Sequence, residues 1–446
     1  MTTDMTEGRA SHILWRFSLP LLISIIFQQL YNIADSVVAG QFIGEGALAA
    51  VGASYPITMI FMAVASGSNV GCSVIISQLF GAKDIPRMKT AVLTALWSML
   101  AVSALFTVVG FLTASPLLKL LGTPENIFEG AELYLQIYIG GLAFLFFYNI
   151  CTGVFTALGD SRTPLYFLIA SSLGNIAMDI LFVAGFRMDI AGVAWATFLC
   201  QGVAAVLAFF TLLRRMKAFQ CEERPAAFSW FMLGRIASVA VPSVLQASFV
   251  SVGNLFIQRL VNAQGSSVIA GYSAAIKLNT FALTAFSTFA SGVSTFAAQN
   301  LGAGKVERVK HGFRAGTWMS LGVAVPFILA YCVFAAQSMR LFLSDGEQAI
   351  AAGVRFLHIT APFYPVIMIK LTCDAVLRGA GSMREFMITT FADLILRVAF
   401  SYLFASFWGE IGIWLSWPIG WSTGTLLSIL FYLRGKWRSI NVLSAH

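Results

Sequence analysis

The sequence predicts an all-α integral membrane protein with twelve transmembrane helices in two six-helix lobes, related by a pseudo-twofold axis along the membrane normal. Composition gives the first indication, because 58% of the 446 residues are hydrophobic and only 11% are charged. Soluble domains carry roughly 25% charged residues, so a soluble fold is excluded. The second indication is that motifs of the first half of the chain return in the second half.

The apolar stretches account for the twelve expected helices. Most of them run for about 20 to 30 residues, which at about 1.5 Å per residue is enough to cross roughly 30 Å of hydrocarbon. Backbone groups cannot stay unpaired in lipid, so each stretch is expected to be helical. The stretches begin near Ile13, Gly46, Met88, Ile127, Pro164, Ile190, Ser229, Gly265, Val309, Glu347, Met383 and Glu410.

The internal repeat predicts how the helices are grouped. Six spans per lobe is an even number, so the second lobe enters the membrane in the same direction as the first and the repeats are parallel, as in many secondary transporters. A polar linker, 214–225, separates an N-lobe, 1–220, from a C-lobe, 221–446. The matched residues are Leu19-Pro20-Leu21 with Val241-Pro242-Ser243, Asn32 with Asn254, Gln78 with Gln299, Gly81-Ala82 with Gly302-Ala303, Arg87 with Arg308, Gly159 with Gly381, and Gly192 with Gly412.

Two further features of the spans concern bending and packing. Pro20 and Pro242 sit at matched positions, where each can bend its helix. The spacing of small residues predicts close helix packing at Gly40/Gly44, Gly67/Gly71 and Gly420/Gly424.

The basic residues predict the orientation. The net charge is +8, and most Lys and Arg fall in loops that are cytoplasmic if the N-terminus is cytoplasmic, such as 83–89, 214–224 and 305–314. This positive-inside pattern places both termini in the cytoplasm. The basic excess is therefore explained by topology, and a nucleic-acid partner is not expected. No cleavable signal peptide is evident.

Several chemistries are not expected. The six cysteines are scattered without CxxC spacing, and five lie in apolar runs as small hydrophobic residues. There is no Walker A motif and no cluster of His, Cys and acids, so neither a nucleotide, nor a cofactor, nor enzymatic activity is predicted. Transport against a gradient would then use an ion gradient.

Ionisable residues inside spans are candidates for function, because each costs a few kcal/mol to place there. Two pairs with a spacing of four residues are expected to neutralise each other: Asp393 with Arg397, and Asp374 with Arg378. Lys277, Arg355 and Lys370 have no evident partner in the local sequence, so their roles stay open.

An oxygen-rich cluster is predicted in the N-lobe. Asp35 in the first span and Asp179 in the fifth both reach the outer half of the bilayer, with Thr197 at a similar depth in the sixth. Asn175 lies one turn from Asp179 on the same face. Carboxylates, an amide and a hydroxyl at one level suit H⁺ or Na⁺, with the two acids titrating as one unit. The alternative is that these polar residues face different crevices.

Three segments make the chain resemble the MATE (multidrug and toxic compound extrusion) family over all twelve spans. They are Gln28-Gln29-Leu30-Tyr31-Asn32-Ile33-Ala34-Asp35, Asn175-Ile176-Ala177-Met178-Asp179 and Ala157-Leu158-Gly159-Asp160-Ser161-Arg162-Thr163-Pro164. The length resembles that of a bacterial member, which implies a location in the bacterial inner membrane. The first-span Asp combined with the fifth-span Asn-x-x-x-Asp is the most specific part of the resemblance.

The resemblance implies cation-driven (H⁺ or Na⁺) antiport of small amphipathic, often cationic compounds through a V-shaped cleft between the lobes, by a monomer with alternating access. It implies a coupling site at Asp35, Asn175, Asp179 and Thr197, with Tyr31 one turn below Asp35. Because the seventh span has no acid, a C-lobe cation site that includes Asp374 is not carried over. The cleft candidates are Tyr31, Gln28, Phe27, Phe144, Phe147, Met178 and Phe286.

A second hypothesis is a flippase for lipid-linked saccharides. An anionic head group would require several Arg or Lys in the cleft and a lateral portal for lipid, and the embedded cations of this chain are few.

Overall fold

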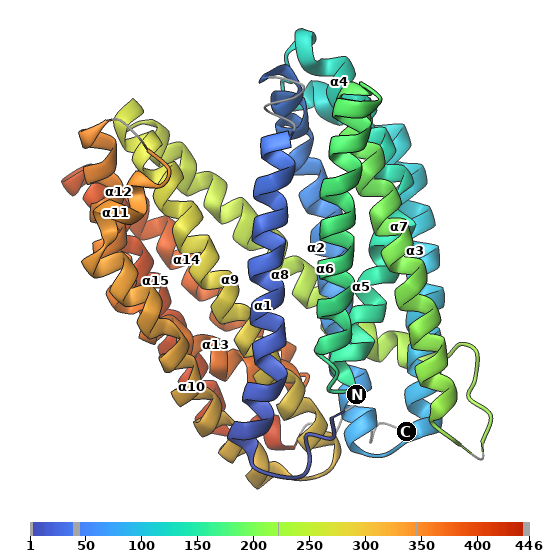
Figure 1. Cartoon of the computed structure of the whole chain (residues 1–446). Coiled ribbons are helices and arrows are strands. Elements are labelled where there is room, and N and C mark those ends of the chain that lie inside the picture. Colours follow the sequence, from blue (N-terminus) through green and yellow to red (C-terminus); the bar gives the residue numbers. More distant parts are fainter. Residues whose placement is uncertain (1–2, 39–44, 222, 344–345, 440–446) are drawn as a thin grey trace. The chain divides into compact units, whose positions relative to one another are not determined.

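The structure is a computed structural model that describes residues 3–38, 45–221, 223–343 and 346–439; of residues 30–38 and 45–48 it describes the backbone alone. Every regular element in these ranges is a helix (Figure 1). The helices are α1 (Ala10–Val38), α2 (Glu45–Gly81), α3 (Ile85–Leu120), α4 (Glu125–Gly140), α5 (Leu142–Ala157), α6 (Arg162–Ile180), α7 (Asp189–Ala218), α8 (Trp230–Asn262), α9 (Ser266–Gly302), α10 (Val306–Val333), α11 (Ala335–Arg340), α12 (Glu347–Thr360), α13 (Tyr364–Gly379), α14 (Met383–Trp408) and α15 (Glu410–Arg434). Short turns of other helix types cover Leu181–Gly185, Ala361–Phe363 and Lys436–Arg438.

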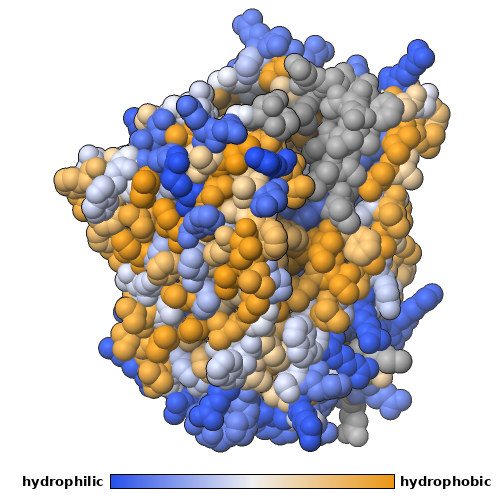
Figure 2. Space-filling view, turned by 60° about the vertical axis from the view of Figure 1, so that its left-hand side comes forward, coloured by the Kyte–Doolittle hydropathy of each residue, from blue (hydrophilic) through white to orange (hydrophobic). Residues whose placement is uncertain are grey.

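The helices are long and apolar enough to confirm a multi-pass membrane protein. Within the described residues, ten segments could each cross a membrane, and eleven if α4 and α5 form one span bent by 49°. On the face shown in Figure 2, hydrophobic residues fill the middle and hydrophilic residues gather at the two ends. This distribution is expected of a chain whose middle contacts lipid.

The chain forms two compact units, each described here by itself. Unit 1 comprises Met1–Asp4 and Leu19–Val244, and unit 2 comprises Met5–Ser18 and Leu245–His446. The chain therefore passes from one unit to the other inside α1, directly before Pro20, and again inside α8, two residues after Pro242. A proline lacks the N–H that would close the helix turn, so each passage lies within a few residues of a missing helix hydrogen bond.

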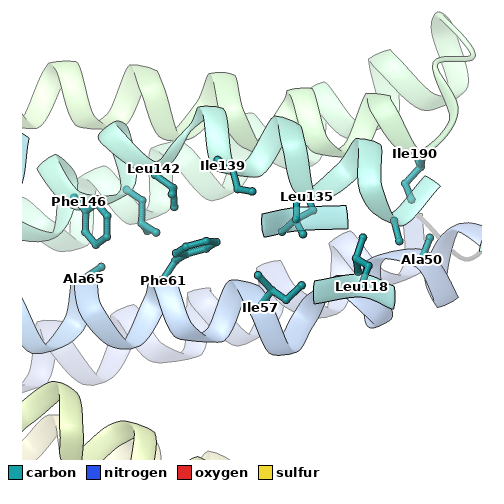
Figure 3. Packing of buried hydrophobic residues seen from close by; sticks show 13 residues of the cluster. Ala50, Ile57, Phe61, Ala65, Leu118, Leu135, Ile139, Leu142, Phe146 and Ile190 are labelled. Carbon is teal, nitrogen blue, oxygen red and sulfur yellow. The ribbon is translucent and has the colours of Figure 1, made fainter. Parts of the chain in front are cut away.

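Unit 1 is built around α2, which packs against α3, α4 and α5, while α7 packs against α4, α5 and α6. Its core interleaves Ile57 and Phe61 of α2 with Leu135 and Ile139 of α4 and Phe146 of α5 (Figure 3). Helix packing in a membrane depends on such close contacts, because lipid is as apolar as the side chains themselves.

Unit 2 is built around α9, which packs against α10, α12 and α13, while α15 lies along α14 and α13. Aromatic side chains fill its core. Phe286 of α9 meets the ring of Phe327 at 5.4 Å and that of Tyr364 at 5.2 Å between centroids, both edge-on. The Tyr364 hydroxyl donates to Asn279 Oδ1 at 3.0 Å, so this buried polar group is satisfied inside the helix bundle.

Small residues allow close approach where their spacing predicts it. A Cβ on Gly71 would lie 2.7 Å from the Ile236 carbonyl oxygen, and one on Gly67 would lie 2.8 Å from the Val244 backbone nitrogen. In unit 2, a Cβ on Gly424 would lie 2.6 Å from Lys370 Cε. The predicted packing role is thus confirmed for Gly67/Gly71 and Gly420/Gly424; Gly40 and Gly44 lie outside the described residues.

Candidate functional site

The N-lobe candidates on α6 and α7 lie together. Asn175 and Asp179 are one turn apart on α6, with exposed fractions of 3% and 0%. Thr197 of α7 faces them, with its Oγ1 at 3.4 Å from the side-chain amide of Asn175. The fourth candidate, Asp35, lies in α1, but its side chain is outside those that the structure describes, and so is that of Tyr31.

Asn175 connects the carboxylate to the neighbouring helix. With its amide oxygen and nitrogen exchanged, Asn175 Nδ2 donates to Asp179 Oδ2 at 2.8 Å, and its oxygen accepts from the Thr197 backbone N–H at 3.1 Å. Only this orientation gives both amide atoms a complementary partner, so it is the one the hydrogen bonds support. A change of charge at Asp179 would therefore alter the hydrogen bonds that join α6 to α7.

Sulfur-containing side chains lie beside this cluster. Met178 Sδ lies 3.5 Å from Cys200 Sγ. Thr197 also lines a pocket of about 10 Å³, the space of a single water molecule, together with Gly141 and residues of α4 and α7. Within the described side chains no group of three or more His, Cys, Asp or Glu could hold a metal, so an ion here would depend on one or two carboxylates with neutral oxygens.

The candidate residues for the substrate cleft differ in exposure and in their ring contacts. In α1, Gln28 is exposed and Phe27 half-buried. In unit 1, Phe144 and Phe147 pack edge-on against Phe198 and Phe209, at 5.4 and 6.1 Å between ring centroids.

Phe286 does not fit a lining role in this structure. It is 0% exposed within the aromatic core of unit 2, because its ring is enclosed by those of Phe327 and Tyr364.

A buried ionic network in unit 2 corrects the predicted charge pairs. Asp374 of α13 pairs with Lys370, one turn earlier, at 2.9 Å, and not with Arg378. Its other oxygen accepts from Thr389 Oγ1 at 3.1 Å and Ser428 Oγ at 2.6 Å. Lys370, whose role was open, is thus the central cation of the network. Lys370 and Arg378 lie four residues before and after Asp374, so both can reach its carboxylate. The contacts of Asp374 with α14 and α15 favour Lys370.

Asp393 also turns to Lys370, with 3.8 Å between Asp393 Oδ2 and Nζ. The predicted Asp393–Arg397 ion pair is not formed among the described side chains; the Arg397 guanidinium instead lies 4.3 Å from the centre of the Trp417 ring. Arg378 similarly lies over Phe386 at 5.8 Å. Both cations are held by ring faces, a contact that favours Arg.

The structure also shows the surroundings of Arg355 and Lys277, whose roles the sequence left open. Arg355 of α12 pairs with Glu410 at the start of α15, with Nε at 2.8 Å from Glu410 Oε1. Lys277 is exposed on α9, and no salt bridge joins it to any residue in the described part of the chain.

Sequence reasoning missed the role of one motif residue. Asp160, in the loop between α5 and α6, is 2% exposed; it accepts from the Thr163 backbone N–H at 3.1 Å and pairs with Arg215 of α7 at 2.8 Å. A lone acid before Ser-Arg-Thr-Pro indicates a helix start, but nothing local indicates the cation that closes the pair.

Comparison with known proteins identifies the family. The MatE family model matches residues 20–181 and again 242–403. The probable multidrug resistance protein YpnP of Bacillus subtilis is 30% identical over 443 residues, 99% of each chain. The probable multidrug resistance protein NorM of Thermotoga maritima is 24% identical over 96% of this chain and 93% of its own, and a FAD transporter of Shewanella oneidensis is 24% identical over 94% and 93%.

Solved structures agree in fold. A MATE crystal structure described as the straight conformation superposes with a TM-score of 0.90 at 22% identity, over 97% of this chain and 98% of the other. A MOP superfamily transporter of Pyrococcus furiosus, described as having a binding pocket of reverse polarity, has a TM-score of 0.89 at 21% identity and the same coverage. The two matched halves and the full-length relative show that this chain belongs to the MatE family of multidrug efflux transporters.

Proposed function

We propose that the protein is a cation-coupled antiporter that exports small amphipathic compounds across a bacterial cytoplasmic membrane, with both termini in the cytoplasm. H⁺ and Na⁺ are the candidate coupling ions. In this proposal α15 supplies the twelfth span beside α14, and the two six-helix lobes alternate in opening to either side. The chain acts as a transporter and not as an enzyme.

The observation that supports the proposal is the buried Asp179–Asn175–Thr197 chain in unit 1. A carboxylate with no exposed surface inside a membrane span is costly and is expected to serve ion coupling. Asn175 Nδ2 donates to Asp179 Oδ2, so protonation of this carboxylate or Na⁺ binding to it weakens a charge-assisted hydrogen bond. Binding of H⁺ or Na⁺ at the site would therefore weaken or rearrange the contact between α6 and α7.

The coupling cycle then follows from charge neutralisation. In the outward-open state Asp179 and Asp35 would take up one cation, and the substrate would leave. The neutral site would permit the turn to the inward-open state, where the cation is released and a new substrate binds. A ligand shifts such an equilibrium only through its different affinity for the two states, which the buried carboxylates supply.

The ionic network of unit 2 supports placing the coupling site in unit 1. The Lys370 ammonium lies 2.9 Å from Asp374 and 3.8 Å from Asp393, in the position that a cation shared by these two acids would need. Lys370 thus already supplies a cation between the two acids, and binding of an ion at that position is not required.

Reconstituted vesicles test the proposal. Efflux of a fluorescent substrate is followed with a pH gradient and a Na⁺ gradient imposed separately, for the parent and for Asp179→Asn. We expect one of the gradients to drive efflux in the parent and neither to do so in the variant. A matched control is Asp84→Asn, which removes an acid from the start of α3 outside the predicted site. Equal gradient-driven efflux in the parent and in Asp179→Asn would contradict the proposal.

A further inference from the structure

One face of α9 in unit 2 combines exposure with polarity along much of the span. Between Ser273 and Ser291, every exposed residue is polar, and Thr284 on the same face is half-buried. The spacing of three and four residues puts these side chains on a single stripe of the helix. We call this stripe the α9 polar face; its members are Ser273, Lys277, Thr280, Thr284, Ser287 and Ser291.

The equivalent face of unit 1 has the same exposure but different chemistry. Gln78 of α2 matches Gln299 of α9 in the internal repeat, which fixes the register between the two helices. The α2 residues at the matched positions are exposed or half-buried as well. All but one of them lack a polar side chain: Gly52, Pro56, Met59, Ala63, Ser66 and Val70. The polarity therefore belongs to the second repeat and is not required by the fold.

Contact with lipid does not account for the α9 polar face. Where α3 is exposed, it presents Leu105, Val108 and Leu112, at 59%, 59% and 74%, as expected for a lipid-facing surface. Ser287 lies roughly 32 Å along α9 from its first residue at about 1.5 Å per residue, well inside a helix that must cross the bilayer. A continuous polar stripe at that depth is expected to face water.

The sign of the charge on this surface is uniform. From Leu245 to Gly302, through the part of α8 in unit 2 and all of α9, the sequence contains no Asp or Glu, and its two charged residues are Arg259 and Lys277. Both are exposed, and Lys277 forms no salt bridge within the described part of the chain. Its ammonium is thus available to an anion from outside the protein, and it would repel a cation.

We propose that the α9 polar face lines the water-filled substrate path, and that Lys277 binds the anionic group of an amphipathic substrate, a carboxylate, phosphate or sulfonate. This inference rests on the proposed export function and specifies its substrate class. The hydroxyls along the stripe supply hydrogen bonds of low directionality, which suit ligands of varied shape.

Two dyes with the same xanthene core and opposite charge test the assignment: carboxyfluorescein, which is anionic, and rhodamine 123, which is cationic. The full chain is reconstituted in phosphatidylcholine vesicles, which have no net anionic head group, and efflux of each dye is driven by an imposed ion gradient. We expect the parent to prefer carboxyfluorescein. Lys277→Gln should lower its rate about two- to fivefold, as expected for the loss of one solvent-exposed charge pair, and Lys277→Glu should favour rhodamine 123.

Lys119→Gln is the matched control, because it removes an exposed Lys from the end of α3 in the other unit. Its dye preference should equal that of the parent. If Lys277→Gln carries both dyes at parental rates, the substrate assignment is wrong while the export function stands. If the parent moves neither dye under either gradient, the proposed function itself fails, and the assignment with it.

A second measurement does not depend on transport. In a background without native cysteines, Ser287→Cys should react with a charged, membrane-impermeant thiol reagent, whereas Val108→Cys on the apolar face of α3 should not. The anionic form of the reagent should react faster than the cationic form at Thr280→Cys, one turn from Lys277, and this difference should vanish when Lys277→Gln is added. If Ser287→Cys is as unreactive as Val108→Cys, the stripe faces lipid and the inference is overturned.

Discussion

The ionic network of unit 2 makes an ordered prediction about two acids. Asp374 makes three contacts, with Lys370 at 2.9 Å, Thr389 at 3.1 Å and Ser428 at 2.6 Å. Asp393 makes one charged contact, with Lys370 at 3.8 Å, and its Oδ1 has no hydrogen-bond partner among the described residues. We therefore expect Asp374→Asn to destabilise the protein more than Asp393→Asn.

The magnitude follows from what each change leaves behind. Removing one partner of a buried ion pair costs about 3–5 kcal/mol. The Asp374→Asn change should lie at the lower end, about 3 kcal/mol, because the amide oxygen can still accept from both hydroxyls and Lys370 keeps Asp393. The Asp393→Asn change should cost about 1 kcal/mol, because no direct hydrogen bond is lost.

Thermal unfolding in detergent, at one scan rate for all variants, measures this order. At about 2–4 °C per kcal/mol for a unit of this size, Asp374→Asn should lower the midpoint by about 6–12 °C and Asp393→Asn by about 2–4 °C. Adding Lys370→Met to Asp374→Asn should lower the midpoint further, because Asp393 then loses its one charged contact and is left as a buried carboxylate. An equal or larger loss for Asp393→Asn would refute the reasoning.

Three further predictions concern coupling and packing. Asp35→Asn should abolish gradient-driven dye efflux while the protein remains folded and inserted, as judged by its unchanged thermal midpoint; parental efflux would exclude Asp35 from the site. Adding Asp179→Asn should make efflux no worse than in the more impaired single variant, because the two acids act as one unit, whereas multiplied losses would show separate roles. Gly271→Ala should cost about 1–3 kcal/mol and lower the thermal midpoint, because its Cβ would meet the Ala349 carbonyl oxygen on α12, unlike Gly322→Ala, whose Cβ has open space.

Part of the candidate site was predictable because two of its residues share one helix face. Asn175 and Asp179 are four residues apart on one apolar helix, and a helix of known pitch places them together. Thr197 was predicted from depth alone, and the Asn175 amide joins it to Asp179. The bridge itself could not be predicted, because it depends on the rotation of α6 against α7.

The charge pairs of unit 2 show the opposite case. Spacing makes Lys370 and Arg378 equivalent partners for Asp374, since each is four residues away on α13. The hydroxyls of Thr389 and Ser428, on α14 and α15, fix the carboxylate toward Lys370. The neighbouring helices therefore decide whether Lys370 or Arg378 pairs with Asp374. How these helices are aligned with α13 cannot be deduced from the sequence of α13 alone.

The sequence alone determined that this protein is helical, spans a membrane many times and repeats its first half in its second. These properties follow from summed apolar content and from the period of a helix, both of which are local. The tertiary structure decided which cations meet which acids, which aromatic residues are core, and which face of α9 stays exposed. Each of these depends on how one helix surface packs against another, and the free energy of that packing is shared among residues far apart in the chain.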